Sequence, residues 1–144
     1  MNNAERLKRK IAESMVRGQK SRANAKYGEF VVQSNEVQYM LALVVLLHSS
    51  FPDKDYENWL YEKAGLGTLI SQFKACAHRT PPMYQLLLQL KDYKKFRDRL
   101  AHKMFSSKTK LTLVECEQAI ALGGKMLPKL YRLARIPKKL WPKF

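Results

Sequence analysis

The spacing of apolar residues constrains this chain most strongly, because it repeats every three to four residues and never settles into alternation. Apolar side chains recur in this way over about 3–22, 29–49, 67–77, 82–104 and 112–134. Such spacing places them on one face of a helix, whereas a half-buried strand requires strict alternation. The sequence therefore predicts an all-α fold, a bundle of four to five helices whose apolar faces form one core.

Composition and glycine positions divide the chain into three predicted parts. Residues 1–26 are expected to form a basic amphipathic helix that serves either as a polyanion-binding arm or as a partner-binding helix. Gly28 is expected to begin a second unit, so that 27–135 forms the helical domain. An interruption or a bend is expected in its last helix near Gly123-Gly124 and Pro128. Residues 136–144 are expected to be a basic tail.

The charge of the chain predicts a polyanionic partner. Its 144 residues include 27 basic and 12 acidic side chains, a net charge of +15. The excess is uneven, since 74–111 carries 10 basic and 2 acidic side chains, whereas 27–73 carries 2 and 6. A concentrated positive charge favours nucleic acid first, and an acidic protein or an anionic membrane surface next.

The remaining patterns exclude several classes of protein. The longest apolar run, 40–47, is far shorter than the roughly 20 residues that span a bilayer. The start of the chain is polar and does not resemble a signal peptide, and Cys76 and Cys116 are expected to be reduced thiols, so we expect a cytoplasmic protein. Three histidines and two cysteines lack the spacing of a zinc site, so no metal or cofactor is expected. Phosphate-binding glycine loops and nucleophile-elbow motifs are also missing.

One segment of the chain contains the candidate site residues: Arg97-Asp98-Arg99-Leu100-Ala101-His102. Arg97 falls on the apolar face of its helix, where a guanidinium must be paired or must line a cleft or subunit interface. Asp98 and His102 are four residues apart, so a carboxylate–imidazole bond could fix the histidine tautomer. Arg97 and His102 lie about 140° apart on an ideal helix, and a two-fold pairing of helices could bring them together. A structural alternative pairs Arg97 with Glu36 or a backbone carbonyl and leaves His102 solvated.

This segment resembles the signature of the HEPN superfamily (higher eukaryotes and prokaryotes nucleotide-binding domain), in which an arginine, a polar residue and a short spacer precede a histidine. Two further stretches are similar to that family: Leu66-Gly67-Thr68-Leu69-Ile70, and Gly28-Glu29-Phe30 followed by Glu36. The resemblance covers about 27–134.

The resemblance implies an all-α domain that dimerises through the motif-bearing helices. It also implies a metal-independent endoribonuclease that acts as a toxin or defence effector with an antitoxin partner. By the same resemblance, Arg97 would stabilise the scissile phosphate, His102 would act as general acid or base, and Asp98 would orient the site. Attack by the RNA 2′-hydroxyl on its own phosphate would then leave a cyclic phosphate.

Two other functions stay open at this point. The first is a catalytically inactive module that binds RNA or an acidic protein within a larger complex, because some members of the HEPN superfamily only bind. The second is a DNA-binding regulator, although no recognition helix after a short turn is evident. The cations expected to track an RNA backbone are those of the motif-bearing helix: Lys91, Lys94, Lys95, Arg99 and Lys103.

Overall fold

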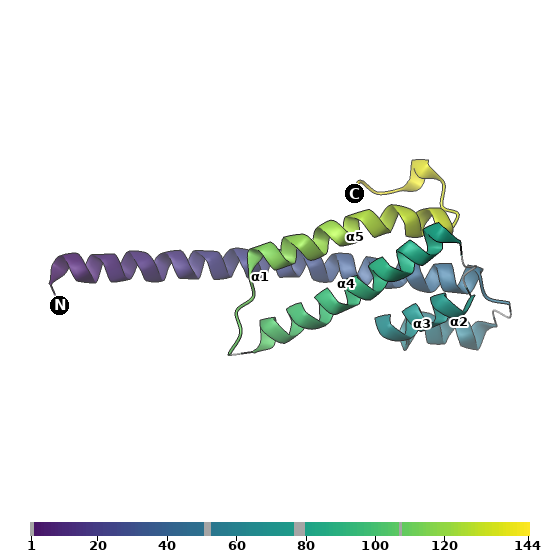
Figure 1. Ribbon diagram of the computed structural model, residues 1–144, viewed down its shortest axis with the longest axis horizontal. Helices are drawn as coiled ribbons and strands as arrows, with labels where there is room; N and C mark the ends of the chain where they lie inside the picture. Colours follow the sequence, from purple (N-terminus) through teal and green to yellow (C-terminus); the bar gives the residue numbers. More distant parts are fainter. Residues whose placement is uncertain (1, 51–52, 77–79, 107) are drawn as a thin grey trace.

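The computed structural model describes residues 2–50, 53–76, 80–106 and 108–144, and within these ranges it is all helical, with no strand. This confirms the predicted all-α class. The elements, shown in Figure 1, are α1 (Asn3–Leu47), α2 (Lys54–Glu62), α3 (Leu66–Cys76), α4 (Pro81–Phe105), α5 (Leu113–Leu133) and a short 3-10 turn η1 (Lys138–Leu140).

The first helix is continuous, so the predicted break at Gly28 is wrong. α1 begins with a capping box in which the Glu5 amide donates to the Asn2 side chain at 2.8 Å, and it ends at Leu47, with His48 as its C-cap. No proline interrupts residues 3–47. An isolated glycine in a helix costs only about 1 kcal/mol relative to alanine, and the packing of the second half of α1 offsets that cost.

Burial, rather than a chain break, separates the N-terminal segment from the domain. Every residue from 2 to 22 is exposed, and burial begins at Ala23. Residues 3–22 project from the bundle as a straight extension of α1, about 30 Å long at 1.5 Å per residue, and Figure 1 shows this extension in purple. We call residues 3–22 the N-terminal arm. The predicted division after residue 26 thus lies close to where packing begins.

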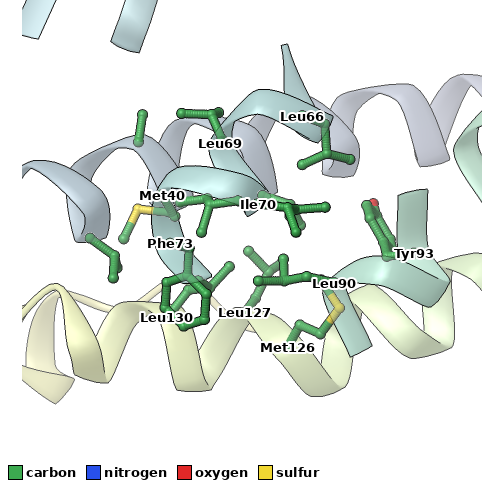
Figure 2. Close-up of a cluster of buried hydrophobic side chains, with 14 of the residues drawn as sticks. Met40, Leu66, Leu69, Ile70, Phe73, Leu90, Tyr93, Met126, Leu127 and Leu130 are labelled. Carbon is green, nitrogen blue, oxygen red and sulfur yellow. The ribbon is translucent and has the colours of Figure 1, made fainter. Parts of the chain in front are cut away.

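The core forms where the second half of α1 meets α3, α4 and α5. Figure 2 shows Met40 of α1, Phe73 of α3, Leu90 of α4 and Leu130 of α5 among these buried side chains. Among the described residues, α1 is the one helix with an 18-residue stretch apolar enough to cross a membrane, and 44% of that stretch is buried inside the molecule. The fully buried Val44 lies in the C-terminal half of α1 and contributes to this core.

A polar contact fixes how closely α1 approaches α4 and α5. The Tyr93 hydroxyl donates to Gln33 Oε1 at 2.9 Å, and Gln33 Nε2 donates to the Ile120 carbonyl at 2.9 Å. Gly123 leaves room for the Gln33 amide. α5 continues through Gly123 and through Pro128, so this helix is not interrupted at either residue. The buried residues around Pro128 keep that turn of the helix packed despite the missing backbone donor.

The C-terminal residues fold back onto α5 rather than forming a free tail. Trp141 and Phe144 lie with ring centroids 6.1 and 5.3 Å from that of Tyr131. The Trp141 indole donates to the Ile136 carbonyl at 2.7 Å. Aromatic packing of this kind holds the segment 138–143, which contains three lysines, against the bundle.

The cysteines and histidines have ordinary structural surroundings. Cys76 and Cys116 are both free thiols, as predicted. His48 caps the C-terminus of α1, with Nε2 3.4 Å from the Leu133 carbonyl oxygen. His78, which the sequence places beside Arg79, lies outside the described residues.

Candidate nucleic-acid interface

The predicted site lies on the last two turns of α4, which the sequence places almost correctly: 82–104 was expected and Pro81–Phe105 is observed. Two prolines in the first turn start this helix, because their missing donors are not needed there. The Arg97 side chain is half-buried, with 32% of its surface exposed, whereas Asp98 and His102 are exposed. Regular helix geometry keeps Arg97 and His102 on different sides of α4 within one chain.

Asp98 is paired with cations instead of with His102. Lys94 Nζ donates to Asp98 Oδ2 at 2.6 Å, and Arg97 Nη2 lies 3.7 Å from Oδ1. Lys94 precedes Asp98 by four residues, just as His102 follows it by four, so the two compete for one carboxylate. Lys94 holds it through a charge-assisted hydrogen bond, which is stronger than one between neutral groups. The predicted Asp98–His102 bond therefore does not form, and His102 makes no hydrogen bond to any residue within the described ranges.

Arg97 is not satisfied by the structural partner considered for it. Glu36 Oε1 instead accepts a hydrogen bond from the Tyr131 hydroxyl at 2.7 Å. Arg97 lies near enough to Tyr93 for its charge to oppose the effect of burial, which raises the pKa of that phenol strongly. Over the part of the chain that the structure describes, the Arg97 guanidinium makes no hydrogen bond. Its donors are therefore available to an anion.

A shallow depression surrounds His102 at the C-terminal end of α4. Its lining includes Ala101, His102, Phe105, Ser106 and Lys108. The Phe105 ring is 83% exposed, more than any other large apolar side chain of the described residues. An imidazole, an ammonium group and a bare aromatic ring therefore share one small surface, a combination suited to a phosphate and a base.

Of the cations predicted to track an RNA backbone, the structure leaves Lys91, Lys95 and Arg99 exposed and without an ion pair to any described residue. Lys94 is neutralised by Asp98, and Lys103 by Glu115. The free cations lie on the outer side of α4 together with His102 and two exposed apolar residues. We call this surface the α4 face: Tyr84, Leu88, Lys91, Lys95, Arg99 and His102.

The pairing of Lys103 has a structural role. Its ammonium group donates to Glu115 in the first turn of α5, joining the end of α4 to the start of α5. The hydrogen bond from Lys103 lowers the pKa of the Glu115 carboxyl. Thr112 caps α5, accepting from the Glu115 amide at 3.3 Å. Lys103 is thus committed to the fold and is not free for a ligand.

Phe105, Ser106 and Lys108 were not singled out by the sequence. They belong to the helix end and to a polar loop, and no fixed spacing relates them to the Arg97–His102 motif. Lys108 bends back toward the helix, where its backbone amide donates to Ser106 Oγ at 3.2 Å. The one available signal was an aromatic residue three positions after the histidine, at the end of an amphipathic pattern.

Among the described side chains, no three or more histidine, cysteine, aspartate and glutamate residues gather in a way that could hold a metal ion. Comparisons of the chain with protein-family models, with curated proteins and with solved structures found no match. The resemblance to the HEPN superfamily therefore rests on the residues quoted above.

Proposed function

We propose that this chain binds RNA through the α4 face and the adjoining His102 depression. The observation that carries this proposal is the set of cations left unpaired on one exposed helix face, Lys91, Lys95 and Arg99. Phosphate contacts of lysine and arginine supply most of the affinity for a nucleic-acid backbone. Tyr84, 59% exposed, and Phe105 stand near opposite ends of α4 and offer rings on which unstacked bases can rest.

The test is a triple substitution that removes the free cations, Lys91→Gln, Lys95→Gln and Arg99→Gln. Glutamine keeps a helix propensity close to that of lysine and arginine, so α4 should persist. We expect weaker binding of single-stranded RNA and a salt slope lower by about two, at about 0.7 per lost phosphate contact. A matched variant, Lys63→Gln, Lys74→Gln and Lys125→Gln, removes the same charge from exposed positions elsewhere. Equal loss in both variants would mean that net charge, and not the α4 face, governs binding.

A second candidate function is metal-independent cleavage of that RNA. It is favoured by two groups that make no hydrogen bond in the described part of the chain: the half-buried Arg97 guanidinium, whose one ion pair is the 3.7 Å contact with Asp98, and the exposed His102 imidazole. The 2′-oxygen would form a bond to the adjacent phosphorus while the 5′-oxygen leaves. His102 would take the 2′-hydroxyl proton or give one to the leaving oxygen, and Arg97 would stabilise the charge on phosphorus.

Cleavage requires Arg97 and His102 to meet at one phosphate. Because they lie on different sides of α4, we propose that a two-fold pairing of α4 helices supplies the arginine from one protomer and the histidine from its partner. In keeping with the HEPN resemblance, such an enzyme would act as a toxin or defence effector restrained by an antitoxin. Without cleavage, the same surface would serve a binding module in a larger complex.

The cleavage test compares wild type with His102→Ala and Arg97→Ala on labelled structured RNA in EDTA. Fragments that end in a 2′,3′-cyclic phosphate from wild type alone are the expected result. His48→Ala is the matched control, since that histidine caps α1 and contacts the Leu133 carbonyl at the end of α5. Binding without cleavage by wild type would leave the RNA-binding function and remove the second candidate.

A further inference from the structure

The N-terminal arm carries charge that the folded domain does not use. Residues 1–26 contain 8 basic and 2 acidic side chains, and every residue from 2 to 22 is exposed. One acid, Glu5, is bound in the capping box, and the other, Glu13, pairs with Arg9 at 3.2 Å. On an ideal helix, four of the six cations without such a partner gather on the side away from the exposed apolar residues Leu7, Ile11 and Met15, whereas Lys8 and Arg22 lie beside those apolar residues. We call the four cations on the far side the arm cations: Arg6, Lys10, Arg17 and Lys20.

The root of this arm lies beside the candidate site. The Cys116 thiol at the start of α5 donates to the Ala23 carbonyl at 3.8 Å, where burial of α1 begins. The next residue toward the N-terminus of α5, Glu115, binds Lys103, which directly follows His102. Figure 1 shows the connection between α4 and α5 at the end of the bundle from which the arm projects. That connection adds two exposed lysines: Lys108, which also lines the depression, and Lys110.

The chemistry of the arm favours a polyanion over the other surfaces that a basic helix can meet. Two arms brought together as a coiled coil would each carry the large positive excess and would repel. A helix that lies in a membrane interface is usually anchored by aromatic or many aliphatic side chains. Residues 1–26 contain no aromatic residue, and the arm has only four exposed large apolar side chains: Leu7, Ile11, Met15 and Val16.

We propose that the N-terminal arm is a second binding site for the RNA phosphodiester backbone, entered from the C-terminal end of α4. This inference rests on the proposed RNA-binding function and extends it. A strand held on the α4 face passes Lys108 and Lys110 and continues along the arm cations. The arm therefore contributes to binding only when the RNA is long enough to leave α4, and it adds about 30 Å to the bound length.

The experiment measures the binding of two single-stranded RNAs to the full chain. The short RNA, about eight nucleotides, covers roughly the α4 face at 3.4 Å per step, and the long one, about 24 nucleotides, reaches the arm as well. The variant replaces the arm cations: Arg6→Gln, Lys10→Gln, Arg17→Gln and Lys20→Gln. The matched control replaces the opposite side of the same helix: Leu7→Gln, Ile11→Gln and Met15→Gln.

We expect the cation variant to bind the long RNA about tenfold or more weakly, with a salt slope lower by about three, and to bind the short RNA as wild type does. The control should bind both RNAs like wild type. Circular dichroism of both variants checks that the arm stays helical.

Three results would overturn the inference. The first is unchanged affinity of the cation variant for the long RNA while the short RNA still binds wild type. The second is an equal loss in the control, which would assign the arm to a partner helix. The third is wild-type binding to vesicles of phosphatidylserine and phosphatidylcholine that is tighter than binding to the long RNA at the same salt and depends on the arm cations. Failure of the short RNA to bind wild type would instead contradict the RNA-binding function itself.

Discussion

Gly123 of α5 and Gln33 of α1 meet so closely that a Cβ atom on the glycine would lie 2.0 Å from Gln33 Oε1. The amide cannot simply move aside, because it holds the Tyr93 hydroxyl on one atom and the Ile120 carbonyl on the other. Tyr93 is fully buried, so its hydroxyl cannot replace this hydrogen bond with one to solvent water. This contact joins α1, α4 and α5 in one polar link within an apolar core.

Gly123→Ala should therefore destabilise the protein although alanine favours a helix. Displacing Gln33 breaks two hydrogen bonds, which we expect to cost about 1–3 kcal/mol in the free energy of unfolding. The adjacent Gly124→Ala is the matched control, because its Cβ would meet open space. That variant should be stabilised by about 0.5–1 kcal/mol. Denaturant unfolding of both variants checks the prediction, and equal effects at the two positions would contradict it.

The Lys103–Glu115 pair should make the free energy of unfolding fall in acid. The pKa of Glu115 is lowered in the folded protein, first by the hydrogen bond from Lys103. The native state therefore binds this proton less readily than the unfolded chain does. The contribution to stability is present above the unfolded pKa, about 4.3, and is lost as the pH falls through the lower folded value.

The measurement compares wild type with Glu115→Gln in denaturant unfolding at several pH values. Wild type should be more stable near neutral pH, and the difference should shrink below about pH 4. Glu117→Gln removes a neighbouring exposed carboxylate and serves as control. A difference that stays constant down to pH 2 would show that the pair does not stabilise the fold.

Much of this fold is predictable because residues at the helix starts indicate where each helix begins. Thr80 with Pro81 and Pro82 marks the start of α4, and Thr112 marks the start of α5, so both ranges are correct within a few residues. The predicted boundary at Gly28 is wrong because a glycine in a sequence suggests the end of a helix. Whether the helix continues through it depends on packing of the residues that follow, which is a tertiary effect.

The candidate site is predictable only in part, for the same reason. The separation of Arg97 and His102 around α4 follows from helix geometry alone. The partner of Asp98 does not, since Lys94 and His102 stand at equal spacing from it and only the structure shows which one binds. The role of Lys103 depends on Glu115, twelve residues away on another helix, and the depression at His102 depends on how the following loop folds.

Asp98→Asn should strengthen RNA binding, contrary to what its place in the motif implies. The substitution removes a negative charge from the edge of the α4 face and frees Lys94, which Asp98 now holds at 2.6 Å. The salt slope of binding should rise by about 0.7, one phosphate contact. Stability should change by less than about 0.5 kcal/mol, because the pair is exposed. Weaker RNA binding by this variant would mean that Asp98 orients the site, as the HEPN resemblance implies.

Tyr131→Phe should remove the hydrogen bond from Tyr131 to Glu36 of α1 and keep the aromatic packing of the C-terminal residues. Burial, with the hydrogen bond to Glu36, raises the pKa of Tyr131 to about 12. A raised phenol pKa stabilises the fold below the unfolded value, about 10, and this stabilisation is lost as the pH rises through about 12. The free energy of unfolding of wild type should exceed that of the variant by about 1 kcal/mol near neutral pH, and the difference should shrink at alkaline pH. Trp141 fluorescence should be retained, since the Phe ring still packs against it; loss of that signal would contradict the assignment.

Phe105→Ala should affect ligand binding and leave the fold intact. The ring is 83% exposed, so its removal should change the free energy of unfolding by less than about 0.5 kcal/mol. Stacking of a base on an aromatic ring contributes about 1–3 kcal/mol, so RNA affinity should fall about fivefold or more. Phe105→Tyr keeps a ring and should bind like wild type. Val114→Ala, which removes another exposed apolar side chain beside the start of α5, should bind RNA normally. If Phe105→Ala also binds normally, the depression at His102 does not hold a base, and RNA contact is restricted to the cations of the α4 face.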